Sequence, residues 1–312
     1  MSTSIELVVL TVGACGVLLL LTLLGDAMRH QGVGGKSSTV VETFVTRVQS
    51  WWAMVILLAV ALLAGMAGAA VLFGFASFAA LREFLTLTTK RQADHWSLAL
   101  AFFVVLPAQY VFVAFGWAAL FSIFVPVYAF LLLPLVSALR GDSQNFLVRV
   151  AETQWGLMIA IYCISHVPAL MTLDIDGFAG REVLLIAFLV IVVQVGDLVD
   201  IFVGRRVGRR KIAPTISPKT YLGAIAGIIA AMLLGATLSW ITPFGLWGAA
   251  GMAGMAAVSG MAGNIVFTAI KRDRGVRDWS HLIPGQGGIL DQLDSVIFAA
   301  PFFYHLTHLV WA

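Results

Sequence analysis

A run of charged and turn-forming residues between positions 263 and 295 carries the clearest chemical signal in this sequence. Asp291 and Asp294 are three residues apart, so on a helix their carboxylates share one face. Mg²⁺ in proteins is commonly held by one or two carboxylates together with phosphate oxygens. Lys271 and Arg272, which precede these acids in the chain, suit phosphate contacts. The pattern predicts a phosphate-handling site, and a solvated loop is the alternative.

A second polar group lies upstream, where Asp197 and Asp200 stand near the end of an apolar run. An ionisable group within a membrane-spanning segment is costly and usually faces a cavity or a partner. A salt bridge to the arginines that follow is the simpler interpretation. The basic run from Arg205 to Arg210 could also act alone, as a membrane-surface patch that attracts anionic lipid.

Ser217, Lys219 and Thr220 form a third feature, placed just before the expected start of a helix. Two hydroxyls and an ammonium group at a helix N-terminus can surround a phosphate and use the helix dipole. The spacing is not that of a P-loop, because the Gly-x-x-x-x-Gly-Lys-Ser/Thr pattern is absent. We therefore predict a second phosphate contact here, of a different kind.

The elements that must position these residues are membrane helices. Of the 312 residues, 60% are hydrophobic and only 11% are charged, whereas a soluble domain carries about 25% charged residues. Lipid must therefore be the solvent, and the fold class is predicted to be an all-α polytopic transmembrane bundle. The first apolar run is expected to be a retained span rather than a removed signal. The two cysteines lie inside apolar runs, which excludes a disulfide framework.

The apolar runs predict about ten spans, at about 20 residues each. Eight or nine remain as alternatives, because the second and third runs, and the pair around 115–117, could each be one kinked element. The ten runs are 5–24, 51–66, 68–81, 96–114, 117–138, 153–172, 183–203, 220–241, 246–270 and 295–311.

The basic residues predict the topology. With ten spans, 18 of the 19 lysines and arginines fall in five loops on one side, and Arg181 alone falls on the other. Lys36 is one of the three basic residues of the first of these loops. The positive-inside rule makes that side cytosolic and places both termini outside. The five loops are 25–50, 82–95, 139–152, 204–219 and 271–294.

The polar segments closely resemble the signature of the phosphatidate cytidylyltransferases, also called CDP-diacylglycerol synthases. That signature reads Ser-x-x-Lys-Arg, four residues, Lys-Asp, then Pro-Gly-His-Gly-Gly-x-x-Asp-Arg-x-Asp. The upstream block from Lys211 to Thr220 resembles the family's Lys-Leu-Ala-Pro-x-x-Ser-Pro-Gly-Lys-Thr, and Asp197 matches a further family aspartate. The resemblance covers roughly 190–305. The matching downstream residues are Lys271, Arg272, Arg277, Asp278, Pro284, Gly285, Gly287, Gly288, Asp291 and Asp294.

The resemblance implies transfer of CMP from CTP to phosphatidate, giving CDP-diacylglycerol and pyrophosphate. It implies Mg²⁺ at Asp291 and Asn264, with or without a second cation, and Asp294 in support. Asp197 and Asp278 are site residues without an assigned role. The residues expected to hold the substrates, including their phosphates, are Ser217, Lys219, Thr220, Lys271, Arg272, Arg277, Gly287 and Gly288.

The same resemblance sets the expected partners and organisation. The partners are CTP, phosphatidate or a similar lipid phosphate, and the bilayer, with no nucleic acid; a homodimer stays open. Residues 1–182 are expected to be N-terminal membrane helices and 183–312 the catalytic region. The expected location is a bacterial inner (plasma) membrane, with the active site on the cytosolic face.

Four departures from the family pattern mark the chain as a divergent paralogue. Asn264 stands where the family has a metal-binding aspartate, Gln286 replaces the histidine, and Gln292 replaces the arginine. Leu222 occupies a position that is usually acidic or an amide, while Thr268 is a mild replacement for serine. Two alternatives therefore remain: a related enzyme acting on another lipid phosphate, such as a polyprenyl phosphate, or a non-catalytic relative that binds lipid or nucleotide.

Overall fold

The computed structural model describes residues 3–30 and 39–312, and it is helical as the sequence predicts. Lys36 lies outside the described residues. Each of the ten expected apolar runs corresponds to one helix or to two helices joined by a π-helical turn. The helices are α1 (Thr3–His30), α2 (Thr39–Leu63), α3 (Gly65–Thr86), α4 (His95–Leu100), α5 (Leu106–Ala114), α6 (Ala118–Ile123), α7 (Phe130–Ala138), α8 (Phe146–Leu157), α9 (Ile164–Ala169), α10 (Val183–Arg206), α11 (Tyr221–Thr237), α12 (Gly245–Asp273) and α13 (Ile289–Trp311).

Nine segments of the described part of the chain are long and apolar enough to cross a membrane. The tenth apolar helix, α11, has 17 residues. At 1.5 Å per residue it measures about 26 Å, close to the roughly 30 Å of a bilayer core. The all-α polytopic membrane bundle is therefore confirmed. The chain is an integral membrane protein.

Two glycines decide the boundaries that the sequence left open. Gly65 has a φ of 70° and Gly116 a φ of 68°, which is the left-handed region that favours glycine. Each ends the preceding helix, so α2 and α3 are separate helices, and α5 and α6 are as well. The helices α4–α5, α6–α7 and α8–α9 each continue through a π-helical turn, at Ala101–Val105, Phe124–Ala129 and Met158–Cys163.

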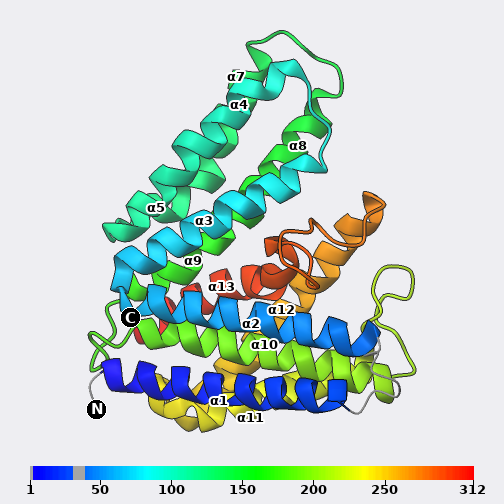
Figure 1. Ribbon diagram of the computed structural model, residues 1–312. Helices are drawn as coiled ribbons and strands as arrows, with labels where there is room; N and C mark the ends of the chain where they lie inside the picture. The colour runs from blue at the N-terminus through cyan, green and yellow to red at the C-terminus, as the bar shows by residue number, and fades with distance from the viewer. Residues whose placement is uncertain (1–2, 31–38) are drawn as a thin grey trace.

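The last four helices form the part of the bundle that holds most of the predicted site. Helix α10 packs against α11, α11 against α12, and α12 against α13, while α10 also touches α12 and α13. Helices α3 to α8 form a group inclined to α1, α2 and α10, and α3 and α9 pack against α13 (Figure 1). A small residue permits the close approach of α12 to α13: a Cβ on Gly263 would lie 2.6 Å from the Phe298 side chain.

Direct contacts bring four of the five predicted cytosolic loops to one end of the bundle. Arg47 Nε donates to the Gly285 carbonyl at 3.1 Å, Arg274 pairs with Glu152 at 2.6 Å, and the Thr89 N–H donates to Glu152 at 2.8 Å. At the other end, Arg181 pairs with Glu6 near the start of α1 at 2.8 Å, and both chain ends lie on that side (Figure 1). The grouping agrees with the predicted topology; which end is cytosolic stays a prediction.

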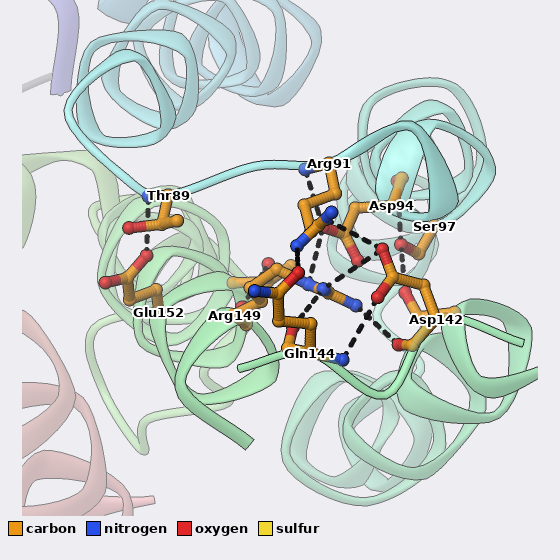
Figure 2. Close-up of polar contacts among 10 residues, drawn as sticks. Thr89, Arg91, Asp94, Ser97, Asp142, Gln144, Arg149 and Glu152 are labelled. Atoms are coloured by element: carbon orange, nitrogen blue, oxygen red, sulfur yellow. Dashed lines mark hydrogen bonds and ion pairs between the residues drawn. The ribbon is translucent and has the colours of Figure 1, made fainter. Parts of the chain in front are cut away.

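The helices extend further into these loops than expected, which buries one basic residue. Arg149 was assigned to loop 139–152, but it lies in the first turns of α8 with 1% of its side chain exposed. Its guanidinium pairs with Asp94 at 3.0 Å and Asp142 at 3.6 Å. Figure 2 shows these groups converging between the α3–α4 and α7–α8 connections, with Arg91 beside them. The cluster clamps the two connections together.

Candidate active site

The first site cluster consists of Lys219, Asp197 and Asp200. Both aspartates project from the last turns of α10. A short hairpin turns the 207–220 connection back toward them, held by hydrogen bonds between the Ile212 N–H and the Lys219 carbonyl and between the Tyr221 N–H and the Arg210 carbonyl. Lys219 Nζ lies 2.6 Å from Asp197 Oδ1 and also binds Asp200 Oδ2. The partner of both acids is Lys219, not one of the arginines that follow them.

Burial strengthens the charge–charge interactions of this cluster, because only 5% of the Lys219 side chain and 5% of the Asp200 side chain are exposed to water. Burial by itself lowers the pKa of Lys219, but attraction and hydrogen bonds from the two carboxylates raise it, and the net change of the pKa is upward. The ammonium therefore stays charged. Asp200 Oδ1 is buried and accepts no hydrogen bond from any described residue. Asp197 and Asp200 also line a small cavity whose other lining residues come from α10, α11, α12 and α13.

The two hydroxyls expected to bind phosphate face the backbone. Thr220 is the N-cap of α11, and its hydroxyl accepts the Gly223 N–H at 3.2 Å. Ser217 Oγ accepts the Lys219 N–H at 3.3 Å. Both side chains are buried, so they shape the hairpin that carries Lys219.

The second cluster is centred on Asp291 in the first turn of α13. Asp291 Oδ1 accepts from Lys271 Nζ at 2.7 Å, and Oδ2 accepts the backbone N–H groups of Trp279 and Gly288, each at 2.8 Å. The carboxylate thus joins the end of α12 to the loop before α13. Both of its oxygens are engaged with donors of the protein.

Asp294 lies within electrostatic range of both clusters. Its Oδ2 accepts from Asn264 Nδ2 at 2.7 Å, and its Oδ1 accepts from the backbone and side chain of Ser295. Asp294 also interacts electrostatically with both Asp197 and Lys271, and Ser295 lines the same cavity as Asp197. The site predicted from two distant segments is therefore one polar region.

Other predicted residues lie at the edge of this region. Arg272, Arg277 and Asp278 are exposed. Gly287 has a φ of 88° and its carbonyl accepts the Ile283 N–H, while the Gly288 N–H is bound to Asp291. Both glycines form the turn into α13.

The departures from the family pattern have local roles. Gln286 donates through Nε2 to the Arg47 carbonyl in α2 at 2.9 Å, and Gln292 donates to the Gln286 carbonyl at 3.0 Å. These two amides help to hold the signature loop on α2. Thr268 bonds to the backbone of its own helix, and Leu222 is exposed on the surface of α11.

Glu83 is the principal residue that the sequence interpretation missed. It lies in the last turn of α3 and is buried, and its carboxylate accepts hydrogen bonds from Ser280, Ile289 and Leu290. A signal was present, since Glu83 is an acid directly after an apolar run. The hydropathy pattern places Glu83 in loop 82–95, where an acid needs no partner.

The donor set fits a cation that shares its coordination with a substrate. Within residues 3–30 and 39–312, no three His, Cys, Asp or Glu side chains are grouped to hold a metal ion by themselves. Mg²⁺, however, commonly takes only one or two carboxylates and completes its shell with phosphate oxygens and water. The buried Asp200 Oδ1, which has no hydrogen-bond partner among the described residues, faces the cavity and has the chemistry of such a ligand. When ionised, the four carboxylates of the site exceed its two ammonium groups by two charges, which a divalent cation would balance.

Comparison with known proteins agrees with this chemistry. The model of the cytidylyltransferase family matches residues 45–310. The uncharacterized protein YnbB of Escherichia coli is 33% identical over 263 residues, which cover 83% of this chain and 85% of that protein. The phosphatidate cytidylyltransferase of Bacillus subtilis is 31% identical over 215 residues, covering 67% and 76%. That of Haemophilus influenzae is 36% identical over 135 residues, covering 41% and 46%.

Proposed function

Because the chain belongs to the cytidylyltransferase family, we propose that it transfers CMP from CTP to phosphatidate, giving CDP-diacylglycerol and pyrophosphate. An oxygen of the lipid phosphate attacks the α-phosphorus of CTP in line. A new P–O bond forms, the bond to the oxygen that bridges to the β-phosphorus breaks, and pyrophosphate leaves. Such a transfer needs positioning and charge neutralisation more than covalent help from the protein.

The observation that carries this proposal is the meeting of two ammonium groups and four carboxylates in one partly buried polar region. Lys219 and Lys271 come from segments 52 residues apart, yet Lys271 and Asp197, a partner of Lys219, both lie within electrostatic range of Asp294. Each ammonium can turn from its carboxylate to a phosphate oxygen when substrate enters. Arg272 is exposed beside Lys271 and can hold the outer phosphates of CTP.

Mg²⁺ would be held by Asp291 and the amide oxygen of Asn264, with the unpartnered Asp200 Oδ1 available to the same or a second cation. The bound ion would neutralise charge on the phosphates of CTP. Asp291 must exchange its contact with Lys271 to serve as a ligand. That exchange would free the Lys271 ammonium for substrate as the metal binds.

The cell location follows from the topology and the substrate. We propose that the protein lies in a bacterial inner membrane with this site on the cytosolic face, where CTP is present. The lipid phosphate would enter laterally at headgroup depth. Tyr221 and Leu222, which are exposed at the start of α11, would lie at that depth.

The test is pyrophosphate release from CTP by the purified full chain in mixed micelles, with phosphatidate or a polyprenyl phosphate, across a Mg²⁺ titration. Turnover with phosphatidate is expected. Asp291→Asn should reduce it by at least about a hundredfold, since charge stabilisation by a metal is worth several kcal/mol. Glu182→Gln, which alters a carboxylate bound to the Gly180 N–H far from the site, is the control and should be silent.

The assay also separates the alternatives. The amides Gln286 and Gln292, which anchor the loop in place of the family's histidine and arginine, favour a changed substrate or a changed role. Turnover only with another lipid phosphate would replace phosphatidate in the proposal. Binding of CTP and Mg²⁺ without pyrophosphate release from any lipid would identify a non-catalytic relative.

A further inference from the structure

Glu83 connects the N-terminal helices directly to the signature loop. Its Oε1 accepts the Ile289 N–H at 2.9 Å and the Ser280 hydroxyl at 2.7 Å, and its Oε2 accepts the Leu290 N–H at 2.9 Å. These partners lie 197 to 207 positions later in the chain. The residue belongs to α3, outside every segment that carries the family signature.

The contact satisfies a need that α13 cannot meet by itself. The first N–H groups of a helix have no partner within it, and the helix dipole makes that end positive. Asp291 binds the Gly288 N–H, while Glu83 binds those of the next two residues. Two carboxylates from different helices therefore share the N-terminus of α13.

Close packing fixes Glu83 in this place. The carboxylate is buried, with 6% of the residue exposed, and a Cβ on Gly288 would lie 2.4 Å from Glu83 Oε2. A side chain at position 288 would therefore displace the Glu83 carboxylate. The next residue, Phe84, stacks on Trp279 with ring centroids 5.6 Å apart, and the Trp279 N–H is bound to Asp291.

From this geometry we propose that Glu83 is a positioning residue of the active site. It acts through Asp291: by capping α13 and holding Ser280, it fixes the turn whose N–H groups orient the Asp291 carboxylate. It also keeps the N-terminus of α13 filled, so substrate phosphates bind at Lys219, Lys271 and Arg272 rather than at the Gly287–Gly288 turn. Both effects on the active site rest on the proposed function, whereas the capping of α13 by Glu83 does not.

The experiment compares the full chain with Glu83→Gln and, as a matched control, Arg82→Gln. Arg82 is the exposed neighbour of Glu83 on α3, and its substitution also changes one charge. Hydrogen–deuterium exchange of peptide 286–292 measures the cap, and kcat and KM for CTP measure the positioning. In Glu83→Gln we expect exchange at Ile289 and Leu290 to be about tenfold faster. We expect kcat to fall about a hundredfold, since small misplacements have effects of this size, with KM for CTP changed less than about threefold.

A second, milder variant keeps the proposal testable if Glu83→Gln does not fold. Ser280→Ala removes one donor and leaves the carboxylate in place, so the same changes are expected at smaller size. Unchanged exchange in both variants, or faster exchange with normal kcat, would overturn the proposal. If the parent releases no pyrophosphate with any lipid phosphate, the proposed function fails, while the exchange data still decide whether Glu83 caps α13.

Discussion

Replacing Lys219 with methionine should lower the free energy of unfolding. The size of the loss measures how far the ammonium offsets the charges of Asp197 and Asp200. The ammonium lies 2.6 Å from Asp197 and also binds Asp200, and 5% of the Lys219 side chain is exposed. Methionine keeps most of the volume and removes the charge, so two neighbouring carboxylates lose their common cation. Breaking a buried ion pair by removing one partner costs about 3–5 kcal/mol. We expect the free energy of unfolding of Lys219→Met to fall by that amount without Mg²⁺.

The measurement is a double-mutant cycle, in mixed micelles titrated with sodium dodecyl sulfate and with chelator present. Asp200→Asn and the double variant Lys219→Met/Asp200→Asn complete the cycle. Because the double variant leaves one carboxylate instead of two, it should be less destabilised than the sum of the single variants by at least about 1 kcal/mol. Mg²⁺ should restore part of the loss in Lys219→Met, since a cation can take the place of the ammonium. Additive effects, or a loss below about 1 kcal/mol in Lys219→Met, would refute this account of the cluster.

The pH dependence of the same variant provides an independent check. The pKa of folded Lys219 lies above its ordinary value of 10.5, despite burial, because two carboxylates surround it. Its contribution to stability is therefore fully present below about pH 10.5 and is lost as the pH rises through the raised pKa. The stability difference between parent and Lys219→Met should stay constant from pH 7 to about pH 10 and shrink above it. A difference that shrinks between pH 7 and pH 9 would contradict a raised pKa.

Three further predictions test other parts of the molecule. Asn264→Asp places a second carboxylate against Asp294, so without Mg²⁺ it should lower the free energy of unfolding by about 1–3 kcal/mol. Mg²⁺ should close that gap and be needed at lower concentration for activity; an unchanged Mg²⁺ dependence would separate Asn264 from the metal. Arg149→Met leaves Asp94 buried without its partner and should lower the free energy of unfolding by about 3–5 kcal/mol, with turnover per folded molecule retained. A fall in turnover per folded molecule would instead give the Arg149 cluster of Figure 2 a role in catalysis. Single cysteines, in a chain with Cys15 and Cys163 replaced, test the topology. Cysteines at Gln92, Ser143 and Ser280 should be labelled only from the cytosolic side, and one at Gly177 only from outside. Labelling of Gln92 and Ser143 from opposite sides would exclude the ten-span arrangement.

The contacts of Glu83 and Arg149 show why some of the site could not be read from the sequence. Hydropathy predicts loops at both positions, because the mean hydropathy falls where charged residues begin. In the structure, α3 and α8 continue past that point, and the two side chains are buried by segments that are distant in the chain. Hydropathy averages over a window, whereas a helix ends where its backbone hydrogen bonds end.

The sequence alone determined the membrane bundle, because 20-residue apolar runs have no other stable arrangement in lipid. It also predicted, together with the family resemblance, that the polar groups near Asp197 and near Asp291 belong to one site, because charged groups near membrane depth need partners. Only the tertiary structure decided which carboxylate pairs with which ammonium or N–H group. Lys219 faces Asp197 and Asp200 because a hairpin turns back on α10, and Glu83 caps α13 because α3 packs beside it. Such pairings depend on distances between helices far apart in the chain, which no local pattern of residues encodes.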